Sequence, residues 1–338
     1  MYTQTVAGAS VKNYTGKIMK NLKYYIGIDW GGTRVKWGAV AENGDFLHKD
    51  TYNYSCYSDI NSNLNLLLDN ISDYINNQET RPLGIGISLT SVVDPAFGVV
   101  YLPGKINGLA QFPIVDKVKQ NFHCPVKADN DGRCALLSER YFGQAQDIDW
   151  AVTLTIGTGI GSGVLLNGQI LRNPHLQFGT QMGHLMMFGN TDQKCLTGFN
   201  GTGEMTCSST ALVLDVRSGL ERGIPSVLSK KYAVDSKAIT FKTIIEDGVR
   251  IGDEFCVDLF DKWIHRLSFL VVNAIHAYGP QRVILSGGAT LASDLFLEKL
   301  QNLVDQKIFI YPPDTSIPIV VSDCQEHSGV LGSICLFK

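Results

Sequence analysis

The sequence predicts an α/β protein of two lobes, each built on a mixed β-sheet that begins with a β-hairpin. Short apolar strands alternate with helical patterns along the chain, which favours layered α/β lobes. A block of strand, glycine turn and hairpin occurs twice, first from Tyr24 and again from Ala151, as an internal duplication would produce. The length of 338 residues suits two domains, which span about 100–200 residues each.

Each block has the same order of elements. In the first, Asn43-Gly44 is the signal of a two-residue hairpin, and Asn167-Gly168 stands at the matching place in the second. Chance likeness between two hairpins is the alternative, because Asn-Gly turns are common. The expected strands of the two blocks are 24–29, 35–40, 46–49, 151–156, 161–166 and 169–171.

The rest of the chain alternates helical and strand patterns. We expect helices at 60–75, 131–141, 208–219, 253–278, 293–304 and 327–337, and strands at 83–88, 125–128, 282–285 and 318–321. Met19 is a candidate for the natural start. We divide the chain into an N-terminal extension (1–23), an N-terminal lobe (24–145), a C-terminal lobe (146–326) and a C-terminal helix (327–338) expected to pack back on the N-terminal lobe.

The composition narrows the choice of partner and compartment. The net charge is −3, and 44% of the residues are hydrophobic, so neither a nucleic acid nor a membrane surface is indicated as a partner. No apolar run reaches the length of a membrane span. The eight cysteines lack the regular spacing of a disulfide framework, and we find no secretory signal before the first strand. We therefore expect a cytoplasmic protein with reduced thiols.

Three glycine turns are candidate phosphate sites. In Asp29-Trp30-Gly31-Gly32-Thr33, the glycines let backbone amides approach phosphate oxygens, and the carboxylate suits a Mg²⁺ ion held through water. The second turn, Gly157-Thr158-Gly159, is followed by a strand and so is not a dinucleotide fingerprint. The third, Ser286-Gly287-Gly288, precedes a helix. The alternative for each is an ordinary tight turn.

The motifs of the chain resemble those of the ROK family of bacterial sugar kinases and sugar-responsive repressors, over nearly all of residues 24–337. The motifs that carry this resemblance are Asp29-Trp30-Gly31-Gly32-Thr33, Gly84 to Val100, Asp129-Asn130-Asp131, Gly157 to Gly161, Met182-Gly183-His184 and Gly287-Gly288. The resemblance implies the two-lobed, actin-like ATPase (ribonuclease H-like) fold and the phosphorylation of a free hexose by ATP and Mg²⁺. It also implies a homodimer or homotetramer.

Roles follow from the same resemblance. Asp131 matches the catalytic base, which takes the proton of the sugar hydroxyl. Helix capping is the alternative for Asn130 and Asp131, because both residue types favour that position. The residues expected to contact the sugar are Ser91, Asn130, Asp131, Gln181, His184 and Glu204. The residues expected to bind ATP are Asp29, Gly31, Gly32, Thr33, Arg34, Gly157, Thr158, Gly159, Gly287 and Gly288.

The chain departs from the family pattern at three places. Gln181 stands where the family sugar motif has Glu, and Thr90-Ser91 replaces a Pro-Gly beside the sugar. In the family's zinc loop, two cysteines have become Thr197 and Thr202. Because a structural zinc site needs four nitrogen or sulfur ligands, we expect the site to be lost, with only His184 and Cys195 remaining.

Other functions stay open at this stage. A sugar-responsive DNA-binding regulator would need a DNA-binding module before the first strand, and we find none in residues 1–23. A sugar-binding protein without kinase activity is compatible with Gln181, although Asp29, Thr33 and Asp131 are retained. A kinase for N-acetylmannosamine, fructose, mannose or allose is a further alternative, with glucose as our first expectation.

Overall fold

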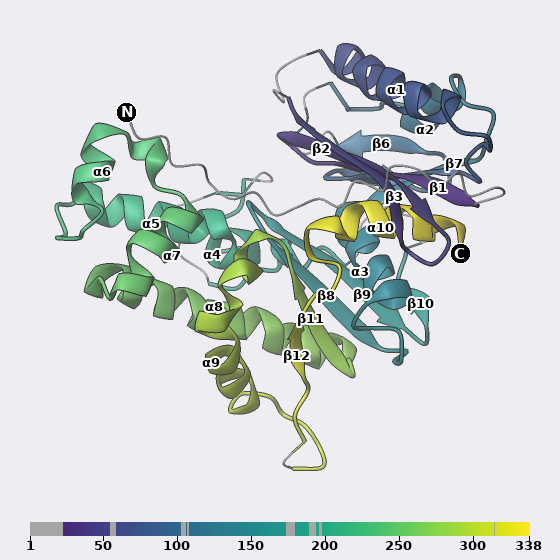
Figure 1. Ribbon diagram of the computed structural model, residues 1–338. Coiled ribbons are helices and arrows are strands. Elements are labelled where there is room, and N and C mark those ends of the chain that lie inside the picture. Colours follow the sequence, from purple (N-terminus) through teal and green to yellow (C-terminus); the bar gives the residue numbers. More distant parts are fainter. Residues whose placement is uncertain are drawn as a thin grey trace.

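The computed structural model describes residues 23–54, 59–102, 106, 108–173, 180–188, 194–195, 198–313 and 315–338. Two five-stranded sheets of equivalent topology organise this part of the chain, in the orders β3-β2-β1-β4-β7 and β10-β9-β8-β11-β12. In each sheet the first two strands pair antiparallel, and the first strand also pairs parallel with a later one. This equivalence confirms the predicted mixed sheets and their duplication (Figure 1).

The N-terminal sheet contains β1 (Tyr24–Trp30), β2 (Arg34–Ala41), β3 (Phe46–Asn53), β4 (Ile85–Leu89) and β7 (Val126–Asn130). The C-terminal sheet contains β8 (Ala151–Ile156), β9 (Ile160–Leu166), β10 (Gln169–Ile170), β11 (Arg282–Ser286) and β12 (Ile319–Val321). A small hairpin of β5 (Val92–Asp94) and β6 (Val99–Leu102) lies beside the N-terminal sheet.

The described helices are α1 (Ile60–Asn76), α2 (Ile114–Lys119), α3 (Asp131–Phe142), α4 (Gly203–Cys207), α5 (Ser209–Glu221), α6 (Ser229–Val234), α7 (Phe241–Asp247), α8 (Glu254–Tyr278), α9 (Ser293–Asp305) and α10 (Ser328–Ile334). The side chains of preceding residues cap the N-termini of several helices. Asp59 accepts from the Ser62 amide before α1, and Asp253 accepts from the Cys256 amide before α8. Gly279, with φ 55°, ends α8 in the left-handed conformation.

Helices α3 and α10 lie between the two sheets (Figure 1). Helix α10 packs on β1 and β4, α3 packs on β8 and β9, and the two helices contact each other. Glycines permit these close approaches, because a side chain on Gly332 would overlap the Cys134 backbone and one on Gly132 would overlap the Ser162 backbone. The outer faces are covered by other helices, with α1 in the N-terminal core and α8 and α9 in the C-terminal core.

The elements expected from the sequence are present, with ends that shift by a few residues. The short elements β5, β6, α2, α4, α6 and α7 were not among them. Asn167 and Gly168, with φ 53° and 73°, form the expected two-residue turn. The first hairpin is different: its loop closes over three residues, with the Ala41 amide donating to the Asp45 carbonyl at 2.9 Å. Residues 1–22, including Met19, lie outside the described residues.

Candidate active site

The first glycine turn joins β1 to β2 and is held from behind. The Gly31 amide donates to the Arg34 carbonyl at 3.0 Å, closing the turn. The Tyr54 hydroxyl donates to the Gly31 carbonyl at 2.6 Å and accepts from the Trp30 indole at 2.9 Å. Thr33 and Arg34 are exposed at the front of the turn. A ligand can therefore reach Thr33 and Arg34 while the aromatic side chains fix the backbone behind them.

Asp29, at the end of β1, is the carboxylate of this turn. It is partly buried, accepts from the Ser88 hydroxyl at 3.3 Å and lies against Gly329 at the start of α10. Burial raises its pKa to about 6, opposed by the nearby Lys36 ammonium and assisted by the negative charge of Asp131. Since β1 and β7 both pair parallel with β4, with Asp29 opposite Ser88 and Ser88 opposite Asp129, Asp29 and Asp131 lie at the same edge of the sheet.

The second and third glycine turns meet at one edge of the C-terminal sheet. Turn 157–159 follows β8, and Gly287 follows β11, the parallel neighbour of β8. Gly287 has φ 91°, and a side chain there would overlap the backbone of Ile156. A Cβ at Gly157 or Gly288 would meet only open space. These turns present bare backbone at a common edge, which is where ligands bind in open α/β sheets.

Asn130 caps α3, so the capping alternative considered for this residue is correct. Its side-chain oxygen accepts from the Gly132 amide at 3.0 Å, and its side-chain nitrogen donates to the Ser91 carbonyl at 3.1 Å. The Asp131 carboxylate accepts from the same Gly132 amide at 2.8 Å and from the Asn130 side chain at 2.9 Å. The structure therefore brings Ser91, Asn130 and Asp131 together at the junction of β7 and α3.

Gln181, His184 and Glu204 come from two segments that pack against each other. Gln181 precedes a 3₁₀ turn that contains His184, and Glu204 lies in the first turn of α4. The Gly203 amide donates to the Leu185 carbonyl at 2.9 Å, which ties α4 to this turn. Gln181 and Glu204 are partly buried, and His184 is exposed.

Several residues that match the family's zinc loop, or lie near it, have other structural roles. Thr202 is buried and caps α4 by accepting from the Met205 amide at 3.4 Å. Cys195 is buried, and Cys207 belongs to the core of the C-terminal sheet. Thr197 lies outside the described residues. Among the residues that the structure describes, no three His, Cys, Asp or Glu side chains are grouped to hold a metal ion.

Two features of the site were missed from the sequence. Lys36 faces Asp29 across the β1–β2 pair, and the length of the glycine turn could have revealed this register. Asp129 is fully buried and paired with two cations, Arg133 at 2.6 Å and Arg172. No local pattern in the sequence links Asp129 to Arg172, because the two lie 43 residues apart.

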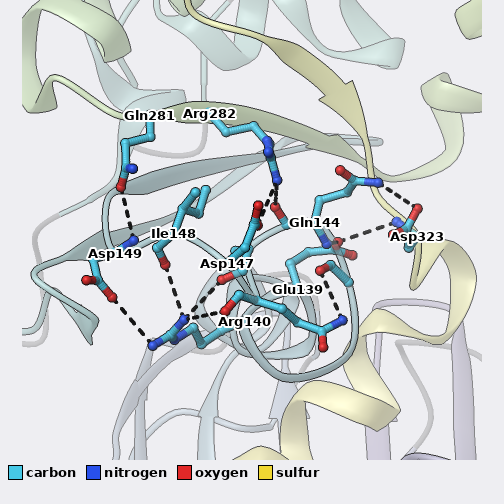
Figure 2. A network of polar contacts seen from close by, with 12 residues as sticks. Glu139, Arg140, Gln144, Asp147, Ile148, Asp149, Gln281, Arg282 and Asp323 are labelled. Carbon is cyan, nitrogen blue, oxygen red and sulfur yellow. Dashed lines mark hydrogen bonds and ion pairs between the residues drawn. The ribbon is translucent and has the colours of Figure 1, made fainter.

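The connection between the two sheets is fixed by a network of polar contacts (Figure 2). Glu139 in α3 is fully buried and accepts from the Ser322 hydroxyl at 2.5 Å and the Gln144 amide at 2.8 Å. Arg140 donates to three carbonyls of the connecting segment, at 3.1–3.2 Å. Arg282, at the start of β11, donates to the Gln144 carbonyl. The network joins α3, the connection and the C-terminal sheet.

Comparisons with known proteins identify relatives of two kinds. A glucokinase of Thermotoga maritima is 28% identical over 93% of this chain and 96% of its own length. A β-glucoside kinase of Listeria monocytogenes is 31% identical over 92% of this chain and 96% of its own length. A xylose repressor of Caldicellulosiruptor bescii is 26% identical over 95% of this chain and 79% of its own length.

Solved structures share the fold. A ROK family glucokinase of Streptomyces griseus, in complex with glucose and AMPPNP, aligns with a TM-score of 0.77 at 23% identity, over 93% of this chain and 98% of its own. A ROK family transcriptional regulator, homologous to the Escherichia coli MLC protein, aligns with a TM-score of 0.78 at 22% identity, over 93% of this chain and 78% of its own. The sequence model of the ROK family matches residues 25–338. The chain is therefore a member of the ROK family and has its two-lobed, actin-like fold.

Proposed function

We propose that the protein is an ATP-dependent sugar kinase that phosphorylates a free hexose, with Asp131 as the general base. The observation that carries this proposal is that β1 and β7 both pair parallel with β4, so Asp29 at the end of β1 and Asp131 just after β7 lie at the same edge of the sheet. Asp29 adjoins the first glycine turn, and Asp131 adjoins the Ser91 and Asn130 cluster. The position of Asp29 suits a phosphoryl donor, and the position of Asp131 suits the hydroxyl group that accepts the phosphoryl group. Relatives that are glucokinases support this reading.

The phosphate end of the site suits a nucleotide. Gly157 and Gly288 leave room beside the backbone, and Thr33 is exposed. Backbone amides in such turns bind phosphate oxygens without the cost of moving side chains. Asp29 offers carboxylate oxygen, the ligand type that Mg²⁺ prefers, and a bound Mg²⁺ would neutralise phosphate charge. The AMPPNP bound by the Streptomyces griseus glucokinase supports ATP as the donor.

At the acceptor end, Asp131 takes the proton of the attacking sugar hydroxyl late in the transfer. Its carboxylate accepts hydrogen bonds from Gly132 and Asn130, and these bonds hold it in one orientation. Asn130 is itself fixed by its bond to the Ser91 carbonyl. Since phosphoryl transfer has a loose transition state, this orientation matters more than the basicity of the carboxylate.

Glucose is the first candidate substrate, with N-acetylmannosamine, fructose, mannose and allose as further candidates. Gln181, His184 and Glu204 supply donors and acceptors from the C-terminal lobe, as a sugar pocket needs. A second candidate function is sugar binding without phosphorylation. The replacement of the family Glu by Gln181 favours it, and the similarity to a xylose repressor is compatible with it. A homodimer or homotetramer remains our expectation for the assembly.

A coupled assay of ADP release over a panel of hexoses and N-acetylhexosamines tests the proposal. We expect at least one sugar to support turnover by the wild type. Asp131→Asn should then lower kcat by roughly a hundredfold or more, with sugar binding retained, because the amide cannot accept the proton. Sugar binding without turnover in the wild type would favour the second candidate. Turnover by Asp131→Asn within a few-fold of wild type would remove Asp131 from the role of base.

A further inference from the structure

Asp129 connects the catalytic segment to the opposite lobe. It ends β7 next to Asn130 and Asp131, and its side chain is fully buried. One carboxylate oxygen accepts from the Arg133 guanidinium at 2.6 Å and from the Asn130 amide at 2.7 Å. The other accepts from Arg172, which follows β10 of the C-terminal sheet. A single carboxylate is therefore held by cations from both lobes.

The two arginines differ in what they hold. Arg133 is buried, with 4% of its side chain exposed, and it also reaches the Val93 carbonyl at 3.4 Å. It belongs to α3 and ties Asp129 to the β5–β6 hairpin within the N-terminal lobe. Arg172 has 36% of its side chain exposed. Asp129 does not need Arg172 for charge neutralisation, since Arg133 already supplies one positive charge.

We propose that Arg172 is a positioning residue for phosphoryl transfer: it aligns the C-terminal lobe with Asn130 and Asp131 through Asp129. Arg172 lies nine residues before Gln181 in the chain, so it starts the segment that leads to the C-terminal sugar motif. Its contact with Asp129 joins the end of β10 to the segment bearing the proposed base. This inference rests on the proposed kinase function, because the alignment serves phosphoryl transfer.

Arg172 bonds to Asp129 through one guanidinium nitrogen, and a planar guanidinium fixes the direction of such a bond better than a freely rotating ammonium group. A displacement of about 1 Å in a catalytic group can cost about a hundredfold in rate. Loss of Arg172 should therefore reduce catalysis although Arg172 touches none of the residues assigned to the nucleotide.

The central experiment compares Arg172→Ala, Arg172→Lys and a control, Arg250→Ala. Arg250 pairs with the exposed Asp294 at 2.8 Å, between the segment before α8 and the start of α9, so it is a matched ion pair outside the site. In Arg172→Ala we expect kcat/KM for the sugar to fall about tenfold or more, with KM for ATP within about threefold of wild type. Arg172→Lys should recover part of the loss, and Arg250→Ala should resemble wild type. Unchanged kcat/KM for the sugar, or an equal loss in the control, would overturn the proposal.

A second measurement keeps this test separate from the kinase proposal. Amide hydrogen exchange of residues 130–133 should be faster in Arg172→Ala than in wild type or Arg250→Ala, because the Asn130 amide bonds to the carboxylate that Arg172 orients. If the wild type phosphorylates no sugar, the kinase proposal fails, and this exchange still decides whether Arg172 orders the segment. Equal exchange in all three proteins would refute the positioning role.

Discussion

At the scale of single residues, Lys36 opposes the effect of burial on the pKa of Asp29. The side chain of Lys36 is 14% exposed, and its ammonium group donates to the Glu326 carbonyl at 2.5 Å. Its positive charge lowers the pKa of Asp29, which burial raises to about 6. The pKa of Asp29 is higher in the folded protein than its ordinary value, so the folded state holds this proton more tightly than the unfolded state. The contribution of Asp29 to folding stability therefore falls as pH rises from 3.8 to about 6. Catalytic activity that needs the ionised carboxylate of Asp29 should instead rise over the same pH range.

We expect kcat/KM of the wild type to fall as pH drops through about 6. In Lys36→Gln this acidic limb should move to higher pH, since the positive charge that lowers the pKa of Asp29 is gone. The measurement is the pH profile of kcat/KM under conditions where sugar and ATP are each limiting. Lys127→Gln is the control, because Lys127 also donates to a carbonyl of the C-terminal segment, that of Leu336 at 2.8 Å. An acidic limb at the same pH in all three proteins would contradict this role for Lys36.

Gln181 is the departure most able to decide the choice of sugar. An ionised Glu only accepts hydrogen bonds, whereas Gln offers an acceptor and two donors. If the rest of the pocket follows the family pattern, ordinary glucose should be a mediocre substrate and a sugar with an N-acetyl carbonyl a better one. Gln181→Glu should shift kcat/KM toward glucose by about 1 kcal/mol, or roughly fivefold. The comparison is kcat/KM for glucose and N-acetylmannosamine in both proteins, and an unchanged ratio would show that Gln181 has no part in specificity.

At this scale, local motifs were predictable and long-range pairings were not. The glycine turns and Asn130-Asp131 could be recognised because their chemistry lies in consecutive residues. The assigned roles of these residues stay predictions. The pairing of Arg172 with Asp129 escaped recognition because it depends on how β10 is placed against β7, which no short sequence pattern encodes. Asn130 caps α3 with its side-chain oxygen and bonds to the Ser91 carbonyl with its side-chain nitrogen, so capping uses only part of this side chain.

At the scale of elements, α10 joins the N-terminal sheet to α3. It packs on β1 and β4 and contacts α3, and its Gly332 lies directly on the Cys134 backbone. A Cβ at Gly332 would have to displace the backbone of α3, whereas one at Gly161 would meet Thr155 at an ordinary distance of 3.4 Å. Overpacking of this kind costs about 1–3 kcal/mol or more.

Gly332→Ala should therefore lower the free energy of unfolding by at least about 1–3 kcal/mol, and Gly161→Ala by about 1 kcal/mol or less. Urea denaturation of both variants and the wild type measures this difference. Equal stabilities for the two variants would mean that α3 and α10 can separate slightly without cost, and the packing argument would fail.

The long elements were predictable because their patterns repeat over several turns. In α1, the buried positions Ile60, Leu64, Leu67, Leu68 and Ile71 form one helical stripe. The short helix α6 has no buried residue, so no hydrophobic period could identify it. The β5–β6 hairpin is held by contacts from outside it, such as the bond from Arg133 to the Val93 carbonyl at 3.4 Å. Such elements depend on partners that the local sequence does not contain.

At the scale of the whole molecule, the connection between the sheets is built as a firm pivot. Glu139, Arg140 and Arg282 fix the segment after α3 from three sides (Figure 2). The side-chain oxygen of Gln281 also accepts hydrogen bonds from the amides of Asp149 and Trp150, at 3.0 and 3.1 Å. Ligand-driven motion should therefore be a rotation about this segment, with the larger displacement at the glycine turns.

Glu139 tests how far the pivot contributes to stability. Its carboxylate accepts from the Ser322 hydroxyl and from the Gln144 and Cys324 amides, so every partner is a donor. In Glu139→Gln, a side-chain NH₂ group would face one of these donors inside the protein. We expect a loss of about 2 kcal/mol or more in the free energy of unfolding. Gln146→Glu, at an exposed position of the same segment, is the control and should be close to wild type in denaturant unfolding. Equal stability of Glu139→Gln and wild type would contradict the pivot.

The same geometry predicts how the molecule responds to its substrates. The proposed phosphate turns come from both sheets, and the proposed sugar contacts come from β7–α3 on one side and the Gln181 and Glu204 segments on the other. A sugar and a nucleotide bound together should draw these parts closer. X-ray scattering should show a smaller radius of gyration with glucose plus a non-hydrolysable ATP analogue than with either alone. Amide exchange of residues 144–150 should stay unchanged, because the pivot does not rearrange. An unchanged radius would mean that the unliganded protein is rigid or already closed. Faster exchange at residues 144–150 would place the hinge within that segment.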